Sequence, residues 1–134
     1  MSIKLLDKLL NDNIELIILS RKGISYELFE FIVSKGSFSI KEWCEFLHLT
    51  ERTLQRYKKD GRSFEPLHSE RILEIAQLQK RGIDVFGNLE NFNQWMNSKI
   101  IALGGIQPKE LLDNSFGIAE VNAELTRIEH GVLA

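Results

Sequence analysis

The chain has 134 residues, of which 43% are hydrophobic and 27% are charged, a composition typical of one globular domain or two very small ones. Its longest apolar run, IELIILS, contains Glu15 and is far shorter than the ~20 residues of a membrane span, and we see no pattern of a secretory signal at the N-terminus. The single cysteine, Cys44, excludes an internal disulfide and favours a reducing cytoplasm.

The formal net charge of -2 conceals a difference between the two parts of the chain. Residues 1–62 hold 11 Lys/Arg and 9 Asp/Glu, which gives +2, whereas residues 63–134 hold 6 and 10, which gives -4. Five basic and two acidic residues fall in TERTLQRYKKDGR, residues 50–62. Because the local charge governs a charge-driven contact more than the total does, this run predicts one basic face.

Three apolar segments precede residue 37. SIKLLDKLLND places four leucines on one helical face after Ser2, which can cap a helix. SYELFEFIVSKG has Ser25 before it and Gly36 after it, which also predicts a helix. Between them, NIELIILSRKG is crowded with Ile and Leu without clear alternation, so it fits either a short helix or a strand.

Two further helices follow with clear boundary signals. Ser39 and Glu42 predict a capping box at the start of SIKEWCEFLHL, in which each side chain accepts a hydrogen bond from the other residue's backbone N–H. In TERTLQRYKKDG, Thr50 is the expected N-cap and Gly61 the stop.

The remaining segments are also helical in pattern. EPLHSERILEIAQLQKRG has Pro66 in its first turn and is expected to end before Gly82. NLENFNQWMNS predicts a shorter helix, LGGIQ a turn, and PKELLDN a helix that starts at Pro108. FGIAEVNAELTRIEHG predicts a last helix with Gly131 in the C-terminal cap position. We therefore expect an all-α fold with two domains, residues 1–82 and residues 83–134.

The stretch SIKEWCEFLHLTERTLQRYKKDG has the layout of a DNA-binding helix-turn-helix. Cys44 supplies the small residue at the helix crossing, and His48 occupies the turn position that usually holds Gly. The side chains expected to point inward are Trp43, Phe46 and Leu47 from the first helix, Leu49 from the turn, and Leu54 and Tyr57 from the second helix.

The outward surface of the second helix is the candidate DNA-reading face. Its predicted DNA-binding residues are Thr50, Arg52, Thr53, Gln55, Arg56 and Lys59. Arg can bind guanine O6 and N7, Gln can read adenine, and Lys, Thr and the helix N-terminus can hold phosphates. Short amphipathic helices joined by a turn also occur in proteins that bind no DNA, so a merely solvated basic face is the alternative.

The last predicted helix carries an apolar stripe in steps of three and four residues. The stripe consists of Ile118, Val121, Leu125, Ile128 and Val132, and the face expected in solvent holds Glu120, Asn122, Glu124, Arg127 and Glu129. Such a stripe packs either on the chain's own core or on a partner.

No residue pattern indicates catalysis or metal binding. The histidines His48, His68 and His130 are scattered, and no Cys/His pair has the spacing of a zinc site. LGGIQPKELL lacks the Gly-Lys-Ser/Thr of a phosphate-binding loop. We expect no metal, no cofactor and no enzymatic activity.

The segment ALGGIQPKELLDNSFGIAEVNAELTRIEHGVLA resembles the C-terminal toxin-binding domain of the Xre/MbcA/ParS antitoxins. The matching features are the pair Gly104–Gly105, Pro108, Leu111–Leu112, Gly117, Val121, Leu125 and the closing RIEHG, Arg127 to Gly131. Upstream, VFGNLENFNQWMNS with Phe86, Gly87 and Trp95 fits the same family, as does ERTLQR. The resemblance covers about residues 40–134, whereas residues 1–35 match no pattern we can name.

The resemblance implies a type II antitoxin that forms a homodimer and a toxin–antitoxin hetero-oligomer, and that represses its own operon by binding operator DNA. The implied partner is a RES-domain toxin that consumes NAD, or a related ADP-ribosyltransferase, whose active-site cleft the C-terminal segment covers. The residues expected to contact the toxin are Arg127, Glu129, His130, Gly131 and Val132. Arg127 is the expected polar anchor, because Arg is enriched among interface hot spots.

Two other functions are compatible with the same residues. The first is a stand-alone helix-turn-helix repressor without a toxin partner, in which the C-terminal segment serves only dimerisation. The second is a pure toxin inhibitor whose helix-turn-helix contributes packing and binds no operator.

Overall fold

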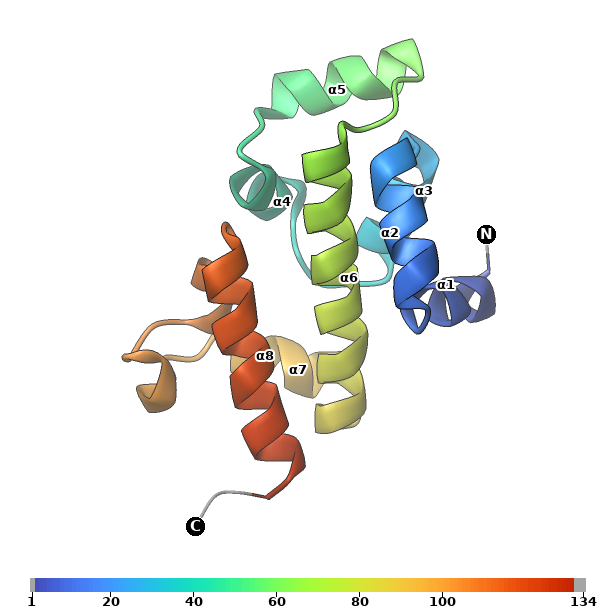
Figure 1. The fold of residues 1–134 in the computed structure, drawn as a ribbon. Coiled ribbons are helices and arrows are strands. Elements are labelled where there is room, and N and C mark those ends of the chain that lie inside the picture. The colour runs from blue at the N-terminus through green and yellow to red at the C-terminus, as the bar shows by residue number, and fades with distance from the viewer. Residues whose placement is uncertain (1, 132–134) are drawn as a thin grey trace. The chain divides into compact units, whose positions relative to one another are not determined.

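The computed structural model describes residues 2–131, and all of their regular structure is helical. The only β-type pairing among these residues is an isolated bridge between Ile100 and Ile106. The prediction of an all-α fold is confirmed. The chain divides into two compact units, Met1–Gln77 and Leu78–Ala134, whose elements are labelled in Figure 1.

The first unit contains five complete helices and the first part of a sixth. They are α1 (Ile3–Leu10), α2 (Asn13–Lys22), α3 (Tyr26–Ser34), α4 (Ile40–Leu47), α5 (Glu51–Asp60) and α6 (Pro66–Phe86). A Ser, Asp or Thr side chain caps the N-terminus of each helix from α1 to α5 by accepting a backbone N–H. The ambiguous segment NIELIILSRKG is the helix α2, which starts after its N-cap Asp12.

An aromatic cluster forms the core of the first unit. The ring of Phe29 on α3 packs edge to face on Trp43 of α4, with 5.5 Å between centroids, and lies 5.1 Å from the ring of Phe64. The buried Ser69 of α6 accepts the backbone N–H of Ile24 at 2.9 Å and donates to the carbonyl of Phe64 at 3.3 Å. This hydroxyl therefore ties α6 to the loops before α3 and after α5.

The second unit begins with the end of α6 and is completed by four short elements. They are α7 (Leu89–Met96), the 3-10 turns η1 (Ile101–Leu103) and η2 (Pro108–Leu111), and α8 (Ser115–Glu129). Its buried side chains include Phe92, Met96, Leu112, Ile118, Val121 and Leu125. The last three residues of that set belong to the apolar stripe predicted for α8, which packs on the unit's own core.

The prediction that α6 ends before Gly82 is wrong, because this glycine serves packing. The helix continues to Phe86, and Gly87, with φ of +92°, follows it. A Cβ atom added to Gly82 would lie 2.1 Å from the ring of Phe92, which is itself buried. Gly82 thus lets α7 approach α6 closely, and a glycine with this role cannot be told from a helix stop by its sequence position.

We predict that Gly82→Ala destabilises the second unit. A mid-helix alanine gains about 1 kcal/mol in helix propensity, but the buried Phe92 ring has no free space to move into, and overpacking of this kind costs about 1–3 kcal/mol. Thermal or urea unfolding should show a net loss of stability, whereas Gln94→Ala on the exposed face of α7 should change it little. A more stable Gly82→Ala protein would contradict this packing role.

Candidate functional site

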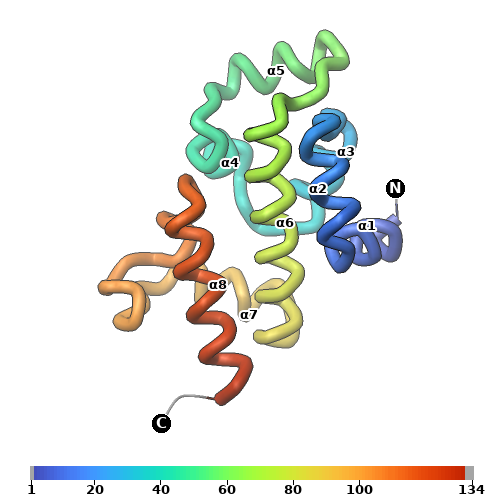
Figure 2. Tube along the Cα trace, viewed as in Figure 1, coloured from blue at the N-terminus to red at the C-terminus, as the bar shows by residue number. Residues whose placement is uncertain are grey.

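The turn between α4 and α5 has the backbone that a helix-turn-helix requires (Figure 2). His48 adopts the left-handed conformation with φ of 56° and ψ of 39°, the only non-glycine residue among those described with positive φ. The N–H of Leu49 donates to the carbonyl of Cys44 at 3.1 Å, and Thr50 then caps α5 by accepting the N–H of Thr53. The expectation that His48 replaces the turn glycine is confirmed.

The residues predicted to point inward hold the two helices together. Trp43, Cys44, Phe46 and Leu47 of α4 and Leu54 and Tyr57 of α5 are buried. Leu49 in the turn is only half-buried. Burial of Leu54 and Tyr57 fixes the rotation of α5 about its axis, so the opposite side of that helix faces solvent.

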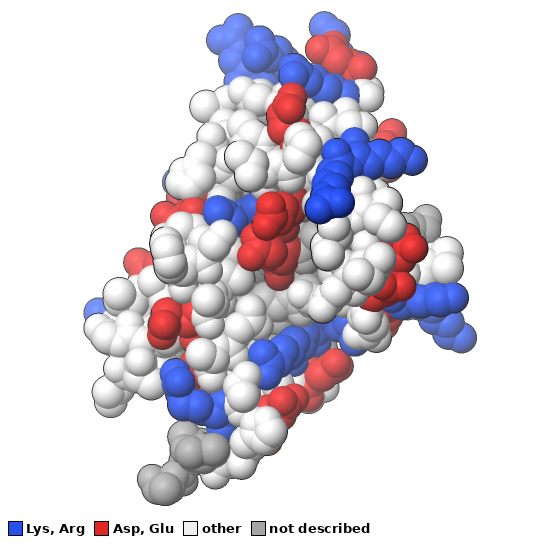
Figure 3. Space-filling model, in the orientation of Figure 1, with Lys and Arg blue, Asp and Glu red and all other residues white. Residues whose placement is uncertain are grey.

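The structure brings the six predicted DNA-contact residues together on α5 and its N-cap. Thr50, Arg52, Gln55, Arg56 and Lys59 are exposed, whereas Thr53 is half-buried and accepts a hydrogen bond from the Thr50 hydroxyl at 3.0 Å. Lys and Arg side chains gather over α5 at the top of Figure 3.

The basic side chains of this region differ in their availability. Lys58 pairs with Glu30 at 3.2 Å, and Arg62 pairs with Glu65 at 3.4 Å while its guanidinium lies over the Tyr57 ring. Within residues 2–131, Arg52, Arg56 and Lys59 enter no ion pair. These three charges are therefore free to meet phosphates or base edges.

Two α6 side chains support the end of α4, and sequence reasoning missed both. The Arg71 guanidinium donates to the carbonyl of Phe46 at 2.9 Å. The second side chain is His68, which forms a hydrogen bond with the backbone of Leu47. Burial lowers the pKa of His68, whereas this hydrogen bond and the nearby Glu65 act to raise it. The sequence alone does not show which helix end a basic residue of α6 will contact.

In the second unit, the expectation that Glu124 lies in solvent is wrong. Its side chain is buried, and Arg127 Nε donates to its Oε2 at 2.7 Å. Glu124 follows Val121 by three residues and precedes Ile128 by four, so it lies on the same helical face as the apolar stripe. The buried carboxylate therefore holds the half-exposed guanidinium of Arg127 in one orientation.

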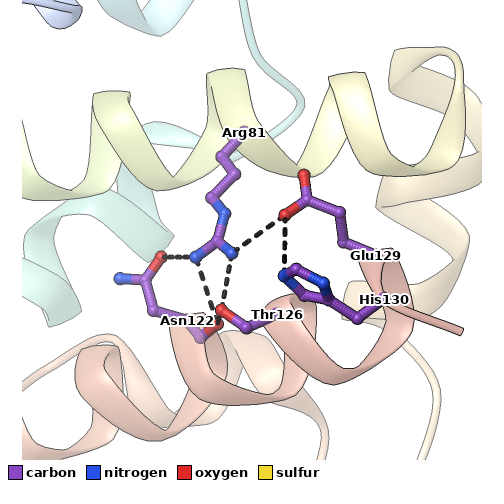
Figure 4. Close-up of polar contacts among 5 residues, drawn as sticks. All are labelled: Arg81, Asn122, Thr126, Glu129 and His130. Atoms are coloured by element: carbon purple, nitrogen blue, oxygen red, sulfur yellow. Dashed lines mark hydrogen bonds and ion pairs between the residues drawn. The ribbon is translucent and has the colours of Figure 1, made fainter. Parts of the chain in front are cut away.

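Arg81 of α6 anchors the last two turns of α8 (Figure 4). Its Nη1 donates to the carbonyl and to the side-chain oxygen of Asn122 at 3.2 and 3.4 Å, and its Nη2 donates to the Thr126 hydroxyl at 2.6 Å. The same Nη2 lies 3.5 Å from Glu129, whose carboxylate oxygen is 4.0 Å from His130 Nε2. Arg81 thus contacts three exposed or half-exposed residues of α8 that lie about one helical turn apart, Asn122, Thr126 and Glu129.

The predicted toxin-contact residues lie at the end of this anchored helix. Arg127, Glu129, His130 and Gly131 are exposed, and Gly131 follows the helix with φ of +65°. Arg127 and Glu129 are each held by an intramolecular partner, Glu124 and Arg81 respectively. Val132 lies outside the described residues.

Sequence reasoning missed three exposed apolar side chains of the second unit. Phe116 in the first turn of α8 is 88% exposed, and Ile101 in η1, which packs against α8, is 93% exposed. Ile106, after the turn, is also exposed. Phe116 falls outside the stripe of Ile118, Val121 and Leu125. This position was the one feature of the sequence that indicated its exposure. Large apolar side chains with this much exposure are candidates for an interaction surface.

Two structural findings for residues 2–131 concern groups of metal-ligating side chains and membrane-spanning helices. No group of three or more His, Cys, Asp or Glu side chains in that range could hold a metal ion. No helix there is both long and apolar enough to cross a bilayer.

Two family profiles match the chain along most of its length. Residues 15–77 match the antitoxin Xre-like helix-turn-helix domain, and residues 81–131 match the antitoxin Xre/MbcA/ParS C-terminal toxin-binding domain. The chain belongs to the Xre-like antitoxins: it is a type II antitoxin with a DNA-binding helix-turn-helix and a C-terminal domain that binds a toxin, and it is not an enzyme.

Curated relatives cover most of the chain at low identity. An "Antitoxin Xre" of Yersinia enterocolitica is 29% identical over 85% of this chain and 78% of its own length, and an "Antitoxin Xre" of Photorhabdus laumondii is 25% identical over 84% and 77%. A "Prs ADP-ribosylating antitoxin" of Sphingobium is 25% identical over 85% and 77%.

We predict that Arg81→Ala loosens the end of α8. Hydrogen bonds from a charged donor contribute about 1.5–3 kcal/mol each when buried, but Arg81 is one-third exposed, so we expect a loss of only about 1–2 kcal/mol. Arg81→Lys should recover little, because an ammonium cannot span Asn122 and Thr126 as the guanidinium fork does. Amide exchange should rise at residues 122–130 relative to the exposed control Lys99→Ala, and unchanged exchange there would contradict the anchoring role.

Proposed function

We propose that this antitoxin inhibits a RES-type, NAD-consuming toxin, or a related ADP-ribosyltransferase, by covering its active-site cleft with the end of α8. The match of residues 81–131 to the Xre/MbcA/ParS toxin-binding domain supports this toxin class. The name of the Sphingobium relative points to ADP-ribosyl chemistry in the same wider family. In this proposal, inhibition is steric. The antitoxin works in the cytoplasm as a homodimer. The boundary between its two domains lies near residues 82 and 83.

The observation that carries the proposal is the fixed orientation of Arg127. The buried carboxylate of Glu124 holds the guanidinium while leaving it half-exposed at the end of an anchored helix. A pre-oriented arginine loses little side-chain entropy on binding, and its guanidinium can donate hydrogen bonds to an acidic group of the partner. Together with Glu129, His130, Gly131 and Val132, Arg127 forms the proposed toxin contact.

The apolar end of α8 extends the same proposed contact. Phe116 and Gly131 are separated by 15 residues, which corresponds to about 22 Å along a helix. An interface of standard size buries about 800 Å² on each partner. A contact surface of this area can include both Phe116 and Gly131. Phe116 and Ile101 would then supply the apolar anchor and Arg127 the polar one.

We expect Arg127→Ala to weaken toxin inhibition strongly. Removal of an arginine hot spot costs at least about 2 kcal/mol, or roughly 30-fold in Kd. The measurement is growth of bacteria that express the protein encoded by the neighbouring gene, together with the intact antitoxin, Arg127→Ala, or a chain lacking residues 127–134. Lys99→Ala, an exposed basic residue of the same unit, is the matched control. Full rescue of growth by the truncated chain would refute the proposed tail contact.

We also propose that the antitoxin represses its own operon through α5. The exposed, unpaired charges of Arg52, Arg56 and Lys59 support this role, as does the capped N-terminus of the helix at Thr50. Gln55 and Thr53 complete the proposed DNA-reading set.

The DNA contact predicts a specific effect of salt. Arg56→Ala should weaken binding to the operon's own promoter about 5- to 100-fold, because a bidentate base contact contributes about 1–3 kcal/mol. Lys59→Ala should lower the slope of log K against log salt by about 1, since one phosphate contact is lost. Lys8→Ala on α1 removes the same charge outside α5 and should change neither quantity. Binding that does not depend on salt would contradict the proposed interface.

A further inference from the structure

Helix α2 presents an apolar stripe to solvent. Ile14, Ile17 and Ile18 are 66%, 44% and 53% exposed, and no residue of α2 is buried. Their spacing of three and one residues places all three on one helical face. A surface helix normally turns its apolar face toward the core, so this face lacks a partner within the first unit.

The neighbouring helix enlarges the same apolar surface. Helix α1 packs against α2 and exposes Ile3 and Leu5, at 47% and 58%. Five large aliphatic side chains are thus exposed on two helices that pack against each other, and exposed apolar residues in this number are candidates for a contact surface.

The charges along α2 identify the partner that fits this face. At about 100° per residue, Glu15 and Lys22 lie on the same flank of the isoleucine stripe, one near each end of the helix. Among residues 2–131, neither side chain enters an ion pair. The helix is therefore acidic at its start, basic at its end and apolar between.

A second copy of α2 satisfies this pattern when it runs antiparallel. A two-fold axis near Ile17 and Ile18 brings the two isoleucine stripes together, and in an antiparallel pair equivalent flanks face each other. Glu15 of one copy then meets Lys22 of the other, twice. In a parallel pair with two-fold symmetry, equivalent flanks lie on opposite sides of the contact, so Glu15 and Lys22 of the two copies would not meet.

We propose that the antitoxin dimerises through an antiparallel α2–α2 contact, with α1 at its border. This inference rests on the homodimer proposed above and assigns its surface. A helix-turn-helix reads two half-sites through a dimer with two-fold symmetry, so an isologous contact in the same unit as α5 suits the DNA-binding role.

Analytical ultracentrifugation of the full chain over a range of concentrations tests the inference. Ile17→Asp should raise the dimer dissociation constant at least 100-fold, because it places a charge in the centre of the apolar contact. Leu67→Asp, the same kind of change at a side chain that is 79% exposed on α6, is the matched control and should leave the dimer intact. Circular dichroism confirms that each variant is folded.

Charge exchange tests the antiparallel arrangement itself. Glu15→Lys and Lys22→Glu should each weaken the dimer, since each creates two like-charge contacts, and the double variant should recover it. A wild-type chain that is monomeric would overturn both the homodimer and this interface. A dimer that survives Ile17→Asp would overturn only the interface, and a double variant that does not recover would overturn the antiparallel pairing.

Discussion

The edge-to-face packing of Phe29 on Trp43 is the contact on which the helix-turn-helix depends. It joins α3 to α4, and the adjoining rings of Phe64 and Tyr57 join the same core to α5. Aromatic pairs of this geometry combine large apolar burial with a defined orientation. Because the inner side of α5 is fixed in this way, its outer side needs no internal partner, and Arg52 and Arg56 can remain exposed for DNA.

In the second unit, charged side chains rather than aromatic rings fix the helix that carries the exposed polar residues. In the proposed toxin contact, the end of α8 has to be both ordered and exposed. Arg81 fixes the backbone carbonyl of Asn122 and the Thr126 hydroxyl, while the buried Glu124 fixes the guanidinium of Arg127. In both units, polar surface is therefore presented from a helix whose other side is immobilised.

Local signals in the sequence predicted the local structure well, whereas contacts between distant residues were harder to predict. Ser39 with Glu42 and the left-handed His48 are determined within a few residues, and both predictions are confirmed. The role of Gly82 depends on Phe92, ten residues away, and the prediction of a helix end there was wrong. The burial of Glu124 was missed because a charged residue was assumed to be solvated, although its spacing from Val121 placed it on the buried face. The exposure of Phe116 and Ile101 depends on how the whole second unit packs, so the sequence pattern gave only a weak indication of it.

Hydrogen–deuterium exchange of the intact chain, with and without the protein encoded by the neighbouring gene, tests the central claim most directly. The account predicts that the added protein slows exchange in the peptides covering Phe116 to Gly131, while α5 keeps the exchange rates of the free chain. If slowed exchange instead appears only in the first unit, or if no peptide of α8 changes on binding, the assignment of α8 as the toxin-binding element is contradicted.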